Sequence, residues 1–233
     1  MRALGRVKPE NWDHIFAKPL DASMLTTPKP VSVGVNWYTS FDSPKQLHDG
    51  SFHVPDASRE SLGTVRGGHC FCLVQMGGVK LLNEHWWRFY DQGDEGACEG
   101  FGHAKAQTLE DGRATFDAWF LYDQARMLDG TYPEGEGTTN HSVAQVLEKD
   151  GAPEQAGAIA TRGAPDGAIE RVASVRWTVS VDEVLGALGR PGAWAVPFSN
   201  SWGTEYPIVT WMPVATLDVL LKEEGEADVC TDA

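Results

Sequence analysis

The sequence predicts an α+β fold in which one β-sheet is built from both ends of the chain. Strand-like segments come first, with alternating or continuous apolar residues at 31–37 and 70–75. Segments between 98 and 149 are rich in alanine and large apolar residues, which favours helices. Strand-like segments return at 194–197 and 208–211. This order favours an α+β fold, and we expect the early and late strands to share one sheet.

The other expected elements follow from local start and stop signals. In chain order they are a strand over 79–82, helices from near Cys98, within 114–129, over 142–149, from Ser180 to before Gly189, and over 217–224. The strand at 79–82 is expected to follow a turn at Gly77 and Gly78. Ser180-Val181-Asp182-Glu183 has the form of a capping box, which is typical of a helix start.

Several stretches are expected to lie outside these elements. The first 28 residues predict an irregular arm, and 43–64 and 151–167 predict loops because they are polar or rich in Gly, Ala and Pro. The acidic run at 222–228 is expected to be a solvated helix end, with Cys230 in a terminal tail.

Composition indicates one globular domain over 1–233. The chain has 233 residues, of which 42% are hydrophobic and 22% charged, which is ordinary for a folded protein. A formal net charge of -14 disfavours nucleic acid and anionic membranes as partners. We see neither a secretory signal in 1–9 nor an apolar run long enough to span a membrane, so we expect a cytoplasmic protein. Four cysteines do not make a disulfide scaffold.

The strongest chemical signal is Asp91-Gln92-Gly93-Asp94-Glu95-Gly96-Ala97-Cys98. A cysteine at a helix N-terminus has a lowered pKa, because unpaired N–H groups and the helix dipole favour the thiolate. The side-chain amide of Gln92 could join the backbone N–H of Cys98 in an oxyanion hole. Cys98 is therefore a candidate nucleophile. The nearby Asp94 and Glu95 would raise its pKa if they lay close, so we expect them to face solvent or a cationic substrate group.

Three segments together resemble motifs of the papain-like cysteine peptidases. They are Gln92-Gly93-Asp94-Glu95-Gly96-Ala97-Cys98, Arg66-Gly67-Gly68-His69-Cys70-Phe71-Cys72 and Ser199-Asn200-Ser201-Trp202-Gly203. The strand at 30–38 also looks like the one that precedes the histidine in bacterial members of the family. The resemblance extends over nearly the whole chain, from about 31 to 225.

The resemblance implies a role for each site residue. Cys98 would be the nucleophile, and Gln92 would donate to the oxyanion. His69 would take the thiol proton and form a thiolate–imidazolium pair, with Cys98 sulfur within about 4 Å of its ring. Asn200 would hydrogen-bond the other ring nitrogen, and Trp202 would shield that bond from water. The implied reaction is hydrolysis of an amide bond in a peptide or protein substrate.

The order of the motifs departs from the family. Papain-like chains usually run Cys, His, Asn, whereas here the order is His69, Cys98, Asn200, so the resemblance implies a circularly permuted two-lobed fold. In that arrangement 1–28 is an arm, 29–90 begins the β lobe, 91–170 is the helical lobe, and 171–233 completes the β lobe and adds the C-terminal helix.

A fainter resemblance, to uncharacterised proteins of actinobacterial phages, shares this motif order. It implies host cytoplasm or a virion as the location and virion proteins as possible partners.

Two other functions stay open. Glu99 stands where the family usually has an aromatic residue, and with the acidic loop it favours a catalytically silent structural or binding protein. The same triad could also serve a transferase or amidase that acts on a small acyl donor.

Other chemistries have weaker signals. His69, Cys70 and Cys72 could begin a metal site, but the sequence has no second ligand pair at suitable spacing, so we expect no metal or cofactor. Ser201 has no base of its own nearby, which disfavours a serine hydrolase. His103 follows Cys98 by five residues, so we expect it on a different face of the same helix. The other histidines are expected at surfaces or in ordinary hydrogen bonds: His14, His48, His53, His85 and His141.

Overall fold

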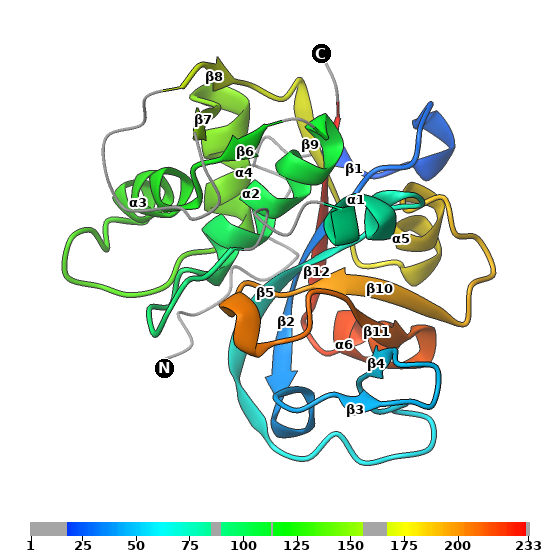
Figure 1. Cartoon of the computed structure of the whole chain (residues 1–233). Helices are drawn as coiled ribbons and strands as arrows, with labels where there is room; N and C mark the ends of the chain where they lie inside the picture. Colours follow the sequence, from blue (N-terminus) through cyan, green and yellow to red (C-terminus); the bar gives the residue numbers. More distant parts are fainter. Residues whose placement is uncertain (1–17, 85–89, 113, 156–166, 232–233) are drawn as a thin grey trace.

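The computed structural model describes residues 18–84, 90–112, 114–155 and 167–231, and this part of the chain is mixed α+β, as predicted (Figure 1). The strands are β1 Lys18–Pro19, β2 Val31–Tyr38, β3 Lys45–Gln46, β4 Phe52–His53, β5 Val65–Leu73, β6 Thr115–Phe116, β7 Ala152–Gln155, β8 Ile169–Glu170, β9 Ser174–Thr178, β10 Ala195–Ser199, β11 Thr210–Pro213 and β12 Glu226–Thr231. The α-helices are α1 Gly78–Glu84, α2 Cys98–Asp111, α3 Ala118–Asp129, α4 Asn140–Lys149, α5 Val181–Ala187 and α6 Val214–Lys222. Short 3₁₀ turns are η2 Ala22–Met24, η3 Thr39–Phe41 and η5 Gly203–Glu205. No helix among the described residues is long and apolar enough to cross a membrane.

One sheet joins the two ends of the chain. Its strand order is β1-β9-β12-β2-β5-β10-β11-β4-β3, as far as the described residues show. The early strand β5 pairs antiparallel with β2 on one edge and with the late strand β10 on the other. The expectation that early and late strands share a sheet is therefore confirmed. Strands β6, β7 and β8 form a separate small sheet.

Alternation along the strands separates the two faces of the large sheet. On β2, Val31, Val33 and Val35 belong to a core that also contains side chains of α5 and α6. The opposite face of β2 and β5 carries small or polar residues and contacts α2. A second core holds α2, α3 and α4 together. In Figure 1 these three helices gather on one side of the central strands, and α5 and α6 lie on the other.

Local signals located most helices. Helix α5 begins after Ser180, whose hydroxyl accepts the Glu183 N–H as a capping box predicts. Helix α3 ends at Gly130, which takes a left-handed conformation with φ 70°. The helices expected over 142–149 and 217–224 correspond to α4 and α6.

The prediction of a strand over 79–82 is wrong, because these residues belong to helix α1. The N–H groups of Lys80 and Leu81 both bond to the carbonyl of Gly77. A run of four apolar or amphipathic residues does not distinguish a strand from a buried helix. Both edges of β5 already pair with β2 and β10, so no open edge was left for a strand that folds back on it.

The end of the chain is also different from the expectation. Residues 222–228 are not simply a solvated helix end, because β12 begins at Glu226 and lies between β9 and β2. Ala227 and Val229 on this strand are fully buried, and Cys230 is buried as well. The chain reverses at Glu224, whose φ of 74° is left-handed, and the alternation that follows fits the central sheet. Part of the predicted loop at 151–167 is β7, while 156–166 and most of the N-terminal arm lie outside the described residues.

Candidate active site

Two neighbouring strands bring His69 and Asn200 together. His69 lies within β5, and Asn200 follows the last residue of β10, whose register places Ser199 opposite Cys72. The His69 Nε2 and Asn200 Oδ1 atoms are 2.7 Å apart and hydrogen-bonded. Asn200 Oδ1 also accepts the Ser201 N–H at 2.8 Å, which holds the amide in place. The imidazole is therefore oriented through Nε2, and Nδ1 is left as the nitrogen for other chemistry.

Tryptophan rings enclose the imidazole. The ring centroids of Trp37 and Trp202 lie 4.7 Å and 4.9 Å from that of His69. His69 is 6% exposed, and this burial lowers its pKa to about 4, although the hydrogen bond to Asn200 and the charge of Asp42 act in the opposite direction. The imidazole is consequently neutral at pH 7. The family motif indicated Trp202, whereas nothing in the sequence singled out Trp37.

The segment before Cys98 is tied to the segment around Asn200. Gln92 N donates to Ser201 O at 2.8 Å, and the Ser201 hydroxyl donates to Gln92 Oε1 at 2.5 Å. Gln92 Nε2 donates to the carbonyl of Glu95 at 2.9 Å. The two motifs therefore lie side by side, although the amide N–H of Gln92 bonds to the protein itself in this conformation. Ser201, dismissed as a nucleophile, is a positioning residue for Gln92.

Cys98 is the first residue of α2, as the sequence predicts. Its side chain is buried, with 9% exposure. Burial and, to a smaller extent, the charge of Glu99 raise the pKa of the Cys98 thiol to about 12. Hydrogen bonds from the backbone of Cys70, Glu99 and Cys98 itself lower the pKa but do not compensate. The expectation of a lowered thiol pKa is thus wrong for this conformation, because desolvation outweighs the helix terminus.

Cys98 and His69 both contact or belong to strand β5. The backbone of Cys70 donates a hydrogen bond to the Cys98 sulfur, and Cys70 directly follows His69 in the sequence. Among the described residues no hydrogen bond joins the Cys98 thiol to the His69 ring. The predicted separation of about 4 Å stays a prediction. With a neutral thiol and a neutral imidazole, the resting site has no thiolate–imidazolium pair.

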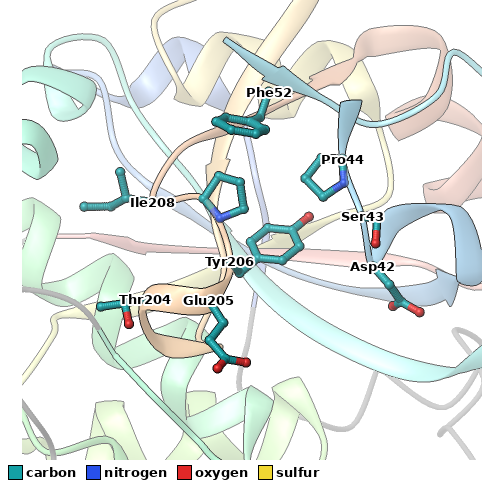
Figure 2. Close-up of a pocket in the computed structure, with 9 residues that line it drawn as sticks. Asp42, Ser43, Pro44, Phe52, Thr204, Glu205, Tyr206 and Ile208 are labelled. Atoms are coloured by element: carbon teal, nitrogen blue, oxygen red, sulfur yellow. The ribbon is translucent and has the colours of Figure 1, made fainter. Parts of the chain in front are cut away.

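A surface cavity of about 450 Å³ lies on the far side of Tyr206 from the enclosed imidazole, and Figure 2 shows the residues that line it. It is lined by Asp42, Ser43, Pro44, Phe52, Thr204, Glu205, Tyr206, Pro207 and Ile208. Tyr206 packs edge-on against Trp202 with 5.3 Å between ring centroids, and Trp202 in turn packs on His69, so two aromatic rings separate the cavity from the imidazole. Asp42 accepts from Trp37 Nε1 at 2.9 Å and pairs with Arg66 at 2.6 Å. The cavity combines apolar rings with two carboxylates.

The acidic loop and the remaining histidines lie apart from this arrangement. Asp94 is exposed, while a Glu95 carboxylate oxygen is 3.8 Å from Arg126 Nη1. His53 stacks between Trp194 and Trp211, with interplanar angles of 6° and 17°. His141 bonds to Gln145 on the same helix. His14 and His85 lie outside the described residues.

Comparisons with known proteins do not assign the chain to a family. No family model matches the chain, and no curated protein matches it. A search of solved structures finds similarity to the crystal structure of xylellain, a cysteine protease from Xylella fastidiosa, with a TM-score of 0.47 and 14% sequence identity. The matched region covers 63% of this chain and 83% of that chain.

Proposed function

We propose that the protein is a papain-like cysteine hydrolase with Cys98 as nucleophile, His69 as base and Asn200 as the residue that orients the imidazole. The observation that carries the proposal is the 2.7 Å hydrogen bond between His69 Nε2 and Asn200 Oδ1 beneath Trp202. Because this bond occupies Nε2, Nδ1 is the ring nitrogen that would accept the thiol proton. The backbone contact between Cys70 and the Cys98 sulfur supports the same site.

The buried site favours proton transfer coupled to attack. Burial disfavours the thiolate and the imidazolium when each is formed alone, so both groups rest neutral. As Cys98 sulfur attacks an amide carbon, its proton passes to His69 Nδ1, and the new charges stabilise each other in the dry site. The imidazolium then protonates the leaving amine, and the C–N bond breaks. Water, deprotonated by His69, hydrolyses the thioester and releases the acid.

Gln92 and the backbone N–H of Cys98 would stabilise the oxyanion in this mechanism. Gln92 Nε2 bonds to the Glu95 carbonyl in the resting state, so the substrate carbonyl must compete for this donor. Ser201 holds the other end of the amide and keeps Gln92 beside the Asn200 segment. The arrangement of β5 ahead of α2 in sequence, with β10 after it, supports a circularly permuted papain-like fold.

The substrate we propose is a peptide or protein. The cavity beside Tyr206 would accept a side chain of that substrate. Its Glu205 carboxylate would favour a polar or cationic group over an acidic one, whereas Asp42 is already paired with Arg66. A location in host cytoplasm or a virion, and virion proteins as partners, remain predictions from the phage resemblance.

A catalytically silent binding protein is the second candidate. The observation in its favour is the pKa of Cys98, raised to about 12, together with the absence of a hydrogen bond from its thiol to His69 among the described residues. A transferase or amidase that uses the same triad differs in the acceptor of the acyl group.

The experiment is covalent trapping with peptidyl acyloxymethyl ketones that carry basic, apolar or acidic side chains, followed by intact mass and peptide mapping. We expect one adduct, on Cys98, and its loss in Cys98→Ser, with Cys72→Ser as the control that keeps it. His69→Ala should slow labelling, because the base is lost. A folded protein in which no probe labels Cys98 faster than a denatured chain supports the silent protein. Products formed with added amines during amide cleavage distinguish a transferase from a hydrolase.

A further inference from the structure

A second polar cluster lies beside α2, and the proposed mechanism does not use it. Cys70 on β5 and Glu99 and His103 on α2 each place one possible ligand atom in this cluster, and these atoms all lie within 4.8 Å of one another. Cys70 and His103 are fully buried. Cys70 points to the face of the sheet that packs on α2, away from the neighbouring His69.

We propose that Cys70, Glu99 and His103 form a binding site for one divalent transition-metal ion of the zinc class. The donors are a thiolate sulfur, an imidazole nitrogen and a carboxylate oxygen, the mixed set that tetrahedral zinc accepts. The Ser32 hydroxyl lies 3.2 Å from both Cys70 Sγ and His103 Nδ1. This contact identifies Nδ1 as the ring nitrogen that faces the sulfur. Nδ1 also donates to the backbone carbonyl of Glu99 at 2.9 Å, so a metal ion bound to Nδ1 displaces this proton and its hydrogen bond. Ser32 or a water molecule would take the fourth position.

A carboxylate stands behind the histidine. His103 Nε2 is 3.5 Å from Asp228 Oδ2 on β12, and Asp228 is 2% exposed. Neither of these two atoms makes a hydrogen bond within the described part of the chain. Metal-binding histidines usually donate their other ring N–H to a carboxylate, which orients the ring and raises its basicity. A metal on Nδ1 would keep the proton on Nε2, where Asp228 can accept it.

Two glycines leave the space that the cluster occupies. A Cβ at Gly102 would lie 2.5 Å from Cys70 Sγ and 3.2 Å from Ser32 Oγ. A Cβ at Gly34 would lie 3.3 Å from Glu99 Oε1.

The test uses Co²⁺ as a spectroscopic substitute for zinc in the full-length chain. Because the cluster is buried, the protein is unfolded in chelator, then refolded with increasing Co²⁺. We expect a thiolate-to-cobalt charge-transfer band and visible bands of tetrahedral cobalt that saturate at one ion per chain. Cys70→Ser should remove the charge-transfer band, and Asp228→Asn should weaken binding by about 10-fold or more. Cys98→Ser and Cys72→Ser, the neighbouring thiols, should retain the band.

A further variant keeps the test decisive if Cys70→Ser does not fold. The chain has four cysteines, so the triple variant Cys72→Ser, Cys98→Ser, Cys230→Ser retains Cys70 as its one thiol, and the charge-transfer band should persist. Absence of the band in the refolded wild-type protein overturns the proposal. The proposal is also overturned if the charge-transfer band persists in folded Cys70→Ser. Loss of the band in folded Cys98→Ser overturns it as well, because the metal would then bind the proposed nucleophile.

Discussion

His69 should make the protein lose stability as the pH falls from 6.5 towards 4. Burial lowers the pKa of its imidazole to about 4, from an ordinary value of 6.5. Between these values the unfolded chain binds a proton at His69 and the folded chain does not, so folding stability falls with the pH. The contribution of His69 is fully present above pH 6.5 and is lost as the pH falls through this window.

The size of the effect follows from the two pKa values. The full difference corresponds to about 3 kcal/mol in the free energy of unfolding. At about pH 4.5 most of it, about 2.5 kcal/mol, should already be lost. His69 is buried between Trp37 and Trp202, so solvent screening reduces this value little.

The assay compares urea unfolding of the wild-type protein and His69→Gln at about pH 7 and about pH 4.5. The other titrating groups are common to both proteins and cancel in the difference. One of them is His103, whose pKa burial lowers but the hydrogen bond and charge of Asp228 raise more, so that it is raised overall. We expect the wild type to lose about 2 to 3 kcal/mol more than the variant over this range. Equal losses would refute a neutral His69 and would indicate that the folded imidazole is protonated, as in a thiolate–imidazolium pair.

Three further substitutions test the packing around the site by chemical denaturation. Gly102→Ala should lower the free energy of unfolding by about 1–3 kcal/mol, because the new Cβ would lie 2.5 Å from a buried thiol. Gly96→Ala, where a Cβ meets nothing closer than 3.4 Å, is the matched control, and an equal loss there would contradict the steric argument. Asp117→Ala removes the side-chain cap at the start of α3 and should cost about 1 kcal/mol, whereas no loss would mean that the cap is not needed. Ser201→Ala should cost about 1–3 kcal/mol, since it leaves the buried Gln92 Oε1 without its donor, and Ser201→Thr should restore most of it.

Short-range patterns in the sequence predicted the elements that local interactions define. Helix α5 could be placed because the Ser180 hydroxyl caps it within three residues, and α3 could be ended because Gly130 adopts the left-handed conformation. The pairing of early and late strands could be predicted from their order alone. The prediction of a strand over 79–82 was wrong because these four residues fit either a strand or a helix. Only the edges of β5, already paired with β2 and β10, decide between the two.

For the candidate site, the residue types and motifs in the sequence nominate His69, Cys98, Asn200 and Gln92 as candidates. The tertiary structure alone decided their electrostatics. A helix N-terminus can be recognised in sequence, but the raised pKa of Cys98 depends on how much water its neighbours exclude. The same holds for the hydrogen bond from His69 to Asn200, which joins residues 131 positions apart.

The cluster of Cys70, Glu99 and His103 shows the same division most clearly. Its residues give no metal-binding spacing in the sequence, because ligands that come from a strand and a helix meet only when the two pack together. Asp228 joins them from β12, and in the sequence it belongs to an acidic run that was expected to be a solvated helix end. Local sequence determines which backbone conformations and side-chain chemistries are available, whereas burial and long-range contact, which set charge states and bring ligands together, arise from packing of the whole chain.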